Sequence, residues 1–329
     1  MNLGRLPELL VFVWMALLLS GAPVSAAPKS QDALRINGKE YVRLTDWATA
    51  NGFSVRWLSK DEVLQLSGPA KLELQIHSPE VQINGIEVRL LFPLAEQRDA
   101  VFIARADLTS TFAPILSPPR SSTRIKTICL DPGHGGKDPG FSVGSNKEKK
   151  YTLLLAKEVQ EQLSRAGFKV YLTRKLDTYP ERAERPDLAR RRKADLFLSL
   201  HFNATESSAR SVQGVEVYCL TPAGAPSSNS GGEGAGAGWF AGNGHNDENM
   251  FLAYQLQKAL TRELGAEDRG VHRARFEVLR EASMPAVLIE GGFMSHPTEG
   301  PKIFTSAYRK QMARAILDGV MAYKTTVER

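Results

Sequence analysis

Four polar side chains of this chain stand where the surrounding sequence is apolar, and their types are those of a hydrolytic site. Three apolar runs each lead to a histidine or glutamate that strand packing does not require: 127–130 before His134, 196–200 before His201, and 286–289 before Glu290. The fourth residue, Glu148, opens a segment of helical character, where a carboxylate interacts well with the helix dipole. Because sites in open α/β sheets form beyond the carboxyl ends of strands, we expect these side chains to converge.

The residue types point to zinc chemistry. Two neutral imidazoles and one carboxylate hold the ion in hydrolytic zinc sites and leave a fourth position for water, a set that His134, Glu148 and His201 fit. Bound zinc lowers the pKa of its water to about 7 and polarises a carbonyl, which makes amide hydrolysis accessible at neutral pH. Glu290 is then the candidate general base, taking a proton from the zinc-bound water and returning it to the leaving amine.

Each of these residues also has a structural interpretation. Glu148 alone is a typical helix-start residue, and a histidine at a strand end is often only hydrogen-bonded. The steps from 134 to 148 and from 148 to 201 fit no short metal motif such as HExxH. Phosphate binding is disfavoured, because Gly133 and Gly135 lack a glycine at 138 and Lys137 lacks one at 131.

The elements that must position these residues follow from the apolar pattern after residue 124. Short apolar runs alternate with amphipathic helices, which predicts an α/β fold: a twisted, mostly parallel sheet with helices on both faces. Leu155, Val159 and Leu163 recur at helical spacing, and a long closing helix is expected after a cap at Thr305 or Ser306.

Six ordered motifs identify a family. They are LDPGHGGKDPG (130–140), Glu148-Lys149, LTR (172–174), ADLFLSLHFNA (194–204), DRGVHRARFEVLR (268–280) and MPAVLIEGGFMS (284–295). Together they resemble the zinc-dependent N-acetylmuramoyl-L-alanine amidases over about residues 124–325. The resemblance implies one zinc ion held by His134, Glu148 and His201, and a catalytic Glu290. It also implies the bond that is cut, the amide between N-acetylmuramic acid and L-alanine in peptidoglycan, in cell-wall remodelling or cell separation.

Two features depart from the family pattern. Arg190 stands where the family usually has Asn, and the run 190–193 is interpreted as a solvated helix face. A glycine-rich insertion, 222–245, interrupts the catalytic domain of 124–329 and is expected to be a mobile loop, with a lid over the site as the alternative. Beside the ligand motifs, Asp131 and Asn203 are candidates for orienting the imidazoles, Asp131 more so.

The preceding region, 28–116, is predicted to be a small β-rich domain. Asn37-Gly38 and Asn84-Gly85 are flanked by alternating apolar residues, the pattern of tight hairpins. The region resembles the N-terminal domain named after copper amine oxidases and found on cell-wall proteins, which implies cell-wall targeting. Residues 117–123, rich in Pro and Ser, are the expected linker.

The first 26 residues have the form of a signal peptide. An apolar run, 9–19, follows Arg5, and Val24 and Ala26 occupy the places expected before a cleavage site. We therefore expect export to the periplasm, the cell wall or the medium. No later run is long enough to span a bilayer, so no transmembrane segment is predicted in the mature chain.

The amino-acid composition disfavours nucleic acid as a binding partner. Lys and Arg (42) exceed Asp and Glu (36) by six, too mild an excess to favour nucleic acid, and no nucleic-acid motif is present. Cys129 and Cys219 are predicted to be buried thiols. His245 and His296 lie in glycine- or proline-rich loops and are expected to be exposed. The expected partners are peptidoglycan and, as a candidate, an activator protein.

Two other functions are consistent with parts of the sequence. One is a catalytically inactive peptidoglycan-binding protein, and the other is a zinc peptidase that cuts within the stem peptide. The presence of all four chemical residues favours the amidase over the inactive binder, since a lost activity would tolerate their replacement.

Overall fold

The computed structural model describes residues 34–205, 211–229 and 238–328, so the predicted signal peptide lies outside the described residues. The strands are β1 (Leu34–Ile36), β2 (Lys39–Arg43), β3 (Ser54–Ser59), β4 (Val63–Ser67), β5 (Lys71–Gln75), β6 (Glu80–Ile83), β7 (Ile86–Arg89), β8 (Ala95–Gln97), β9 (Ala100–Ala104), β10 (Thr127–Pro132), β11 (Ser142–Val143), β12 (Asn146–Lys147), β13 (Lys169–Leu172), β14 (Leu196–Asn203), β15 (Val215–Leu220), β16 (Asp268–Ala274) and β17 (Ala286–Phe293). The helices are α1 (Leu44–Ala50), α2 (Arg105–Asp107), α3 (Ala113–Leu116), α4 (Glu148–Arg165), α5 (Glu184–Arg191), α6 (Asn246–Leu264), α7 (Glu277–Arg280), α8 (Glu299–Ile303) and α9 (Ser306–Val327), with a π-helical turn at Leu108–Phe112 and a 3₁₀ turn at Ala241–His245.

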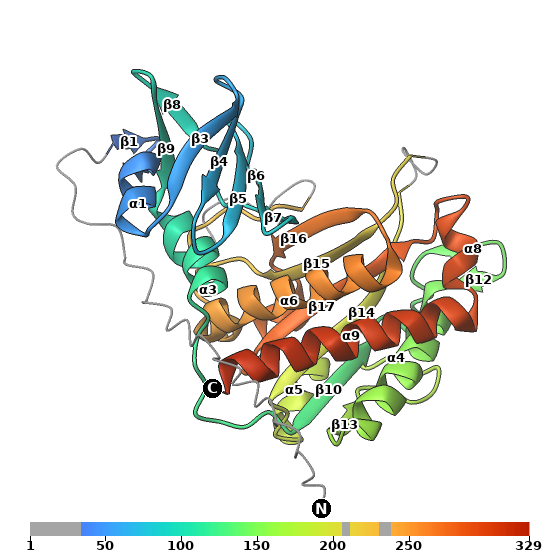
Figure 1. Cartoon of the computed structure of the whole chain (residues 1–329). Coiled ribbons are helices and arrows are strands. Elements are labelled where there is room, and N and C mark those ends of the chain that lie inside the picture. Colours follow the sequence, from blue (N-terminus) through green and yellow to red (C-terminus); the bar gives the residue numbers. More distant parts are fainter. Residues whose placement is uncertain (1–33, 206–210, 230–237, 329) are drawn as a thin grey trace, which may run out of the picture.

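A sheet with the order β13-β10-β14-β17-β15-β16 forms the centre of the C-terminal region (Figure 1). The pairs β10–β13, β10–β14, β14–β17 and β15–β16 are parallel, and only β15–β17 is antiparallel. The mostly parallel sheet predicted from the sequence is confirmed.

Helices cover both faces of this sheet, as expected for strands that are apolar on both sides. Helices α4, α6 and α9 pack on one face (Figure 1). Helices α5 and α7 pack on the other face, where their apolar residues join the cluster that contains Phe197. Along β14, Leu198 and Leu200 face the first set of helices, whereas Phe197 belongs to the apolar cluster on the opposite face. The polar residues of the site share the second face with Phe197, because side chains alternate along a strand.

The closing helix and the cysteines agree with the sequence analysis. The Thr305 side chain accepts a hydrogen bond from the Tyr308 amide at the start of α9. Cys129 and Cys219 are both buried free thiols. No helix in the described ranges is long and apolar enough to cross a bilayer.

The N-terminal region is β-rich, as predicted. Both Asn-Gly pairs form tight hairpin turns, with φ of 48° at Asn37 and 74° at Gly38, and 50° at Asn84 and 78° at Gly85. Positive φ at both central residues is what a type I′ turn requires, so these dipeptides set the hairpin registers. Strands β1, β2, β9 and β8 form a separate four-stranded sheet.

The structure joins the two regions more closely than a linker suggests. Strand β7 pairs with β16 in parallel, with Val88 opposite Val271, so that β3 to β7 extend the central sheet to eleven strands (Figure 1). The edge of β16 thereby gains a partner for its backbone groups. The boundaries at 28–116 and 117–123 remain predictions.

Buried polar contacts hold this junction together. The guanidinium of Arg273, 2% exposed, donates to the carbonyls of Arg89 and Ser110 at 2.9 Å each and to the Thr111 hydroxyl at 2.9 Å. The Tyr254 hydroxyl donates to the Ile83 carbonyl at 3.1 Å. We therefore expect the junction to be rigid.

Candidate active site

His134 lies in the glycine-rich loop that follows β10. Its φ of 59° is in the left-handed region, which non-glycine residues rarely adopt and which is common at functional sites. The Gly133 amide donates to the Leu200 carbonyl at 2.9 Å, which ties the loop to β14. A Cβ at Gly133 would lie 2.2 Å from the His201 ring, so only glycine lets that ring pack on the loop.

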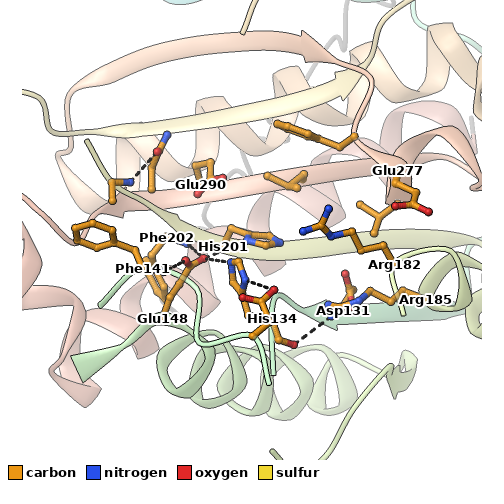
Figure 2. Close-up of a pocket in the computed structure, with 16 residues that line it drawn as sticks. Asp131, His134, Phe141, Glu148, Arg182, Arg185, His201, Phe202, Glu277 and Glu290 are labelled. Carbon is orange, nitrogen blue, oxygen red and sulfur yellow. Dashed lines mark hydrogen bonds and ion pairs between the residues drawn. The ribbon is translucent and has the colours of Figure 1, made fainter. Parts of the chain in front are cut away.

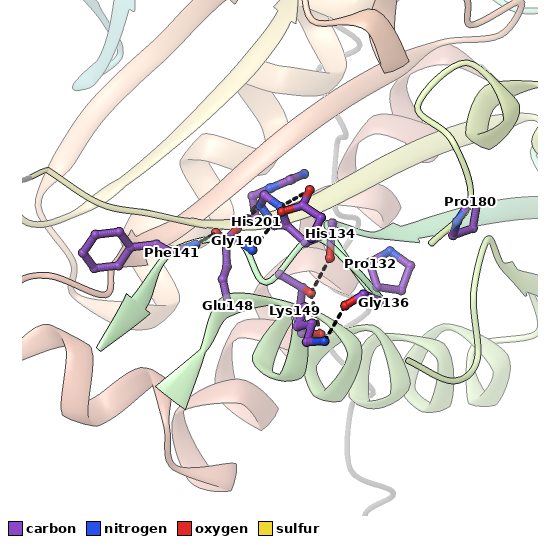
Figure 3. Close-up of polar contacts among 12 residues, drawn as sticks. Pro132, His134, Gly136, Gly140, Phe141, Glu148, Lys149, Pro180 and His201 are labelled. Carbon is purple, nitrogen blue, oxygen red and sulfur yellow. Dashed lines mark hydrogen bonds and ion pairs between the residues drawn. The ribbon is translucent and has the colours of Figure 1, made fainter. Parts of the chain in front are cut away.

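Glu148 is the first residue of α4, and its side chain is buried beside His134 and His201. Its Oε2 accepts a hydrogen bond from the Phe141 amide at 3.0 Å, and its Oε1 accepts one from the Phe202 amide at 3.2 Å. Gly140 approaches so closely that a Cβ would lie 2.5 Å from Glu148 Oε2, and its φ of 64° also favours glycine. Two backbone donors and this tight loop fix the carboxylate (Figure 3).

The structure brings His134, Glu148 and His201 together. Oε1 of Glu148 lies 3.0 Å from Nε2 of His134 and 3.1 Å from Nδ1 of His201. One donor atom from each of the three residues lies within 4.8 Å of the others, a group that could hold a metal ion. The side chains come from a loop, a helix start and a strand, so the spacing in sequence could not fit a short motif.

Asp138 is a functional candidate that the sequence analysis missed. Its Oδ2 lies 2.9 Å from Nδ1 of His134, while its Oδ1 accepts the Gly140 amide at 3.0 Å. A proton on Nδ1 directed at Asp138 leaves the lone pair of Nε2 facing Glu148 and His201, an arrangement common around metal-binding histidines. Its signal was the carboxylate four residues after His134, within the glycine-rich motif.

Charges within the cluster perturb its pKa values. Burial opposes the charged form of His134, but the carboxylates of Glu148 and Asp138 outweigh it and raise its pKa. Burial likewise raises the pKa of Glu148, but the hydrogen bonds and charges of the two histidines outweigh it and hold the pKa below its ordinary value. The cluster therefore favours an ionised carboxylate beside two imidazoles.

Glu290 lies on β17 directly opposite His201 on β14. Its Oε2 is buried and has no hydrogen-bond partner among the described residues. Burial, together with the carboxylates of Glu148 and Glu216, raises its pKa well above the ordinary value. An unpartnered carboxylate of raised pKa beside the cluster is suited to accept and return a proton.

Glu216 completes a row of polar residues across three strands. It lies on β15 opposite Glu290, and its carboxylate is held by Asn203 at 2.7 Å, by the Tyr218 hydroxyl at 2.8 Å and by Arg269 at 3.1 Å. These donors satisfy Glu216, whereas Glu290 keeps a free oxygen. The two glutamates are thereby given different environments.

A cavity of about 410 Å³ opens over this row. Figure 2 shows Phe141 at one end, Arg182 and Glu277 at the other, and the histidines with Glu290 between them. Its lining is formed by Asp131, His134, Asp138, Phe141, Glu148, Arg182, Arg185, His201, Phe202, Asn203, Ala204, Phe276, Glu277, Val278, Leu288 and Glu290. A substrate in this cavity would contact all four predicted site residues.

Asp131 and Asn203 were expected to orient the imidazoles, but their hydrogen bonds go to other residues. Asp131 is fully buried and accepts hydrogen bonds from Thr173 at 2.6 Å, Ser199 at 2.8 Å and Arg185 at 3.2 Å. Asn203 instead donates to Glu216. Asp138, not Asp131, is the carboxylate that orients His134.

Two further expectations concern surface residues. His296 was expected to be exposed, but it is nearly buried, with only 9% of its surface accessible. Its Nδ1 accepts a hydrogen bond from the Glu299 amide at 3.3 Å inside a turn. Arg190 is exposed and pairs with Asp187, as expected for a solvated helix face. The described residues of the insertion 222–245 do not line the cavity; Asn243, for example, donates to the Thr221 carbonyl at 3.0 Å.

Comparison with known proteins assigns the family. Residues 128–322 match the family described as N-acetylmuramoyl-L-alanine amidase. The chain belongs to this family. Among solved structures, the N-acetylmuramoyl-L-alanine amidase of Clostridium difficile 630 has a TM-score of 0.52 and 31% identity, covering 62% of this chain and 99% of that one. AmiC2 of Nostoc punctiforme has a TM-score of 0.51 and 30% identity, with the same coverage. The predicted fold class is thereby confirmed.

Curated relatives share the amidase region and differ in length. LytC of Bacillus subtilis is 34% identical over 65% of this chain and 40% of its own length, and AmiC of Neisseria meningitidis is 34% identical over 67% and 58%. The chain thus spans about half the length of these relatives. The CwlD amidase of Clostridioides difficile, with a TM-score of 0.50 and 26% identity, was solved in complex with the GerS lipoprotein.

Proposed function

We propose that this chain hydrolyses the amide bond between N-acetylmuramic acid and L-alanine in peptidoglycan and that it requires zinc. The observation that carries the proposal is the convergence of His134, Glu148 and His201 beside the unpartnered Glu290. Family membership supports the choice of substrate.

The types of the three donor atoms fit a zinc ion. Three donors, two imidazole nitrogens and one carboxylate oxygen, are the protein ligands typical of catalytic zinc sites, which leave one position for water or substrate. Asp138 holds His134 in the tautomer that a ligand needs. His134, Glu148 and His201 would therefore hold the ion.

Glu290 performs the proton transfers in this proposal. When bound, zinc lowers the pKa of water to about 7 and polarises the scissile carbonyl. The Glu290 carboxylate takes a proton from the attacking water and delivers it to the amine of L-alanine as the C–N bond breaks. Its raised pKa matches both tasks, because a group that must gain and then lose a proton works best near the operating pH.

We also propose the cellular context that the sequence predicts. The 1–26 segment directs export to the periplasm or cell wall, and the β-rich region 28–116 aids attachment to the wall. An activator protein is a candidate partner, since the related CwlD amidase was solved with a lipoprotein bound.

Mass analysis of digested sacculi tests the proposed function against its alternatives. The zinc-loaded protein should release intact stem peptides with a free L-alanine amino terminus. Shortened stems would instead identify a zinc peptidase, and binding without release would identify an inactive peptidoglycan-binding protein. The matched control is protein treated with a chelator and then resupplied with zinc.

A further inference from the structure

One end of the catalytic cavity carries an arginine that the reaction above does not use. Arg182 lines the cavity and lies in the turn just before α5. Figure 2 shows its side chain directed along the cavity, at the end opposite Phe141. Among the described residues, its guanidinium makes no hydrogen bond or ion pair. Glu277 lines the same end of the cavity without pairing with it.

Arg182 lines the same cavity as the predicted site residues. Asp138, His134 and Glu290 also line this cavity. Asp138 is the residue that orients His134. A ligand that binds Arg182 therefore lies within reach of the reacting centre.

The turn that carries Arg182 is held in a fixed position by its neighbour Arg185. The guanidinium of Arg185, 3% exposed, donates to the Pro180 carbonyl at 3.1 Å, to Asp131 at 3.2 Å and to the His134 carbonyl at 3.2 Å. The same buried side chain thus binds the turn before Arg182 and the loop of His134. Such support keeps a binding group at a constant distance from the catalytic groups.

We propose that Arg182 is a specificity residue that binds a carboxylate on the peptide part of the substrate. An accessible guanidinium without a partner matches a carboxylate in charge and in its two-pronged geometry. The peptide then lies toward α5 and α7, and the glycan lies toward Phe141. This inference rests on the proposed amidase function, and it adds the direction in which the substrate crosses the cavity.

Two soluble muropeptides test it, one with a free carboxylate on the stem peptide and one with that group as a carboxamide. Wild type should have the lower KM for the carboxylate substrate. Arg182→Gln should raise the KM of the carboxylate substrate about tenfold, a size typical of one charged hydrogen-bonded contact, and leave kcat and the carboxamide substrate nearly unchanged. Arg182→Lys should retain part of the preference, because it keeps the charge. Arg190→Gln, on the exposed side of α5, is the matched control and should change neither KM.

Several results would overturn the inference. Equal KM values of the wild-type protein for the two substrates would already contradict it, before any variant is measured. Equal losses on both substrates in Arg182→Gln would assign the residue a structural role instead. Zinc content and thermal unfolding of each variant are measured alongside.

A binding measurement separates this inference from the proposed function. The zinc-loaded Glu290→Gln variant is titrated with the two free stem peptides by calorimetry, with and without Arg182→Gln. Tighter binding of the carboxylate peptide that disappears with Arg182→Gln supports the inference even if wild type cleaves neither muropeptide. Cleavage of both substrates by wild type, with no difference in binding, supports the function and contradicts the inference.

Discussion

Glu290 on β17 and Glu216 on β15 are register partners on adjacent antiparallel strands, so two carboxylates share one buried face beside the candidate metal ligands. Asn203, Tyr218 and Arg269 donate hydrogen bonds to Glu216. The pKa of Glu290 is raised mainly by burial, next by the charge of Glu148, and then by the charge of Glu216. This pairing gives one glutamate a structural role and leaves the other able to exchange a proton.

Glu216→Gln should shift the pH profile of kcat/KM. Glu290 must be ionised to act as a base, so activity is lost as pH falls through its raised pKa. Removing the neighbouring charge lowers that pKa, and the acid limb of the profile should therefore move to lower pH. The profile is measured on a soluble muropeptide, with Glu281→Gln, an exposed substitution, as control. An acid limb that stays in place or moves to higher pH would contradict the coupling.

His134→Ala, Glu148→Ala and His201→Ala should each deplete bound zinc. Each substitution removes one of three converging donors, and the remaining two cannot hold the ion with comparable affinity. Metal content per chain is measured by elemental analysis after dialysis, with His77→Ala at an exposed position as control. Any of the three variants that keeps one zinc per chain removes that residue from the ligand set.

Zinc affinity should also depend on pH in a defined direction. The pKa of His134 is raised in the metal-free cluster, so protons compete with the ion for Nε2 as pH falls through that value. The apparent affinity should therefore weaken as the pH is lowered from 8 toward 5, measured by competition with a chromogenic chelator. Asp138→Asn should weaken affinity at pH 8 by about 10- to 100-fold, because it no longer orients His134. Unchanged affinity in Asp138→Asn would assign that carboxylate to loop structure alone.

Arg273→Ala should destabilise the junction between the N-terminal region and the central sheet. It leaves two carbonyls and one hydroxyl without their donor, and one such buried group costs about 1–3 kcal/mol. Chemical denaturation should show a loss of at least about 2 kcal/mol, whereas Arg314→Ala, exposed on α9, should have little effect. A loss no greater than that of the control would mean that β7–β16 pairing alone secures the junction.

Local chemistry explains what could be predicted from the sequence. Asn37-Gly38 and Asn84-Gly85 form the predicted turns because few residues adopt positive φ at two successive positions. The apolar runs before His134, His201 and Glu290 form neighbouring strands, and the ends of these strands meet because parallel strands share a carboxyl edge.

Features that depend on pairing between distant segments could not be predicted. The antiparallel direction of β15, which places Glu216 beside Glu290, leaves no mark in its apolar pattern. The β7–β16 pair likewise joins Val88 and Val271, which no local rule relates. Asp138 was missed because its contact with Nδ1 of His134 depends on how the loop folds back, with a positive φ at His134. The sequence does not specify that loop conformation.

The central claim is that Glu290 moves the proton and does not hold the metal. The most direct test measures zinc content and turnover together in Glu290→Gln, with Glu281→Gln as the control. The amide keeps the shape of the side chain and removes the base, so the variant should retain one zinc per chain and lose about 10²- to 10⁴-fold in kcat. Loss of zinc would make Glu290 a ligand, and retained turnover would remove it from the reaction; either result contradicts the account.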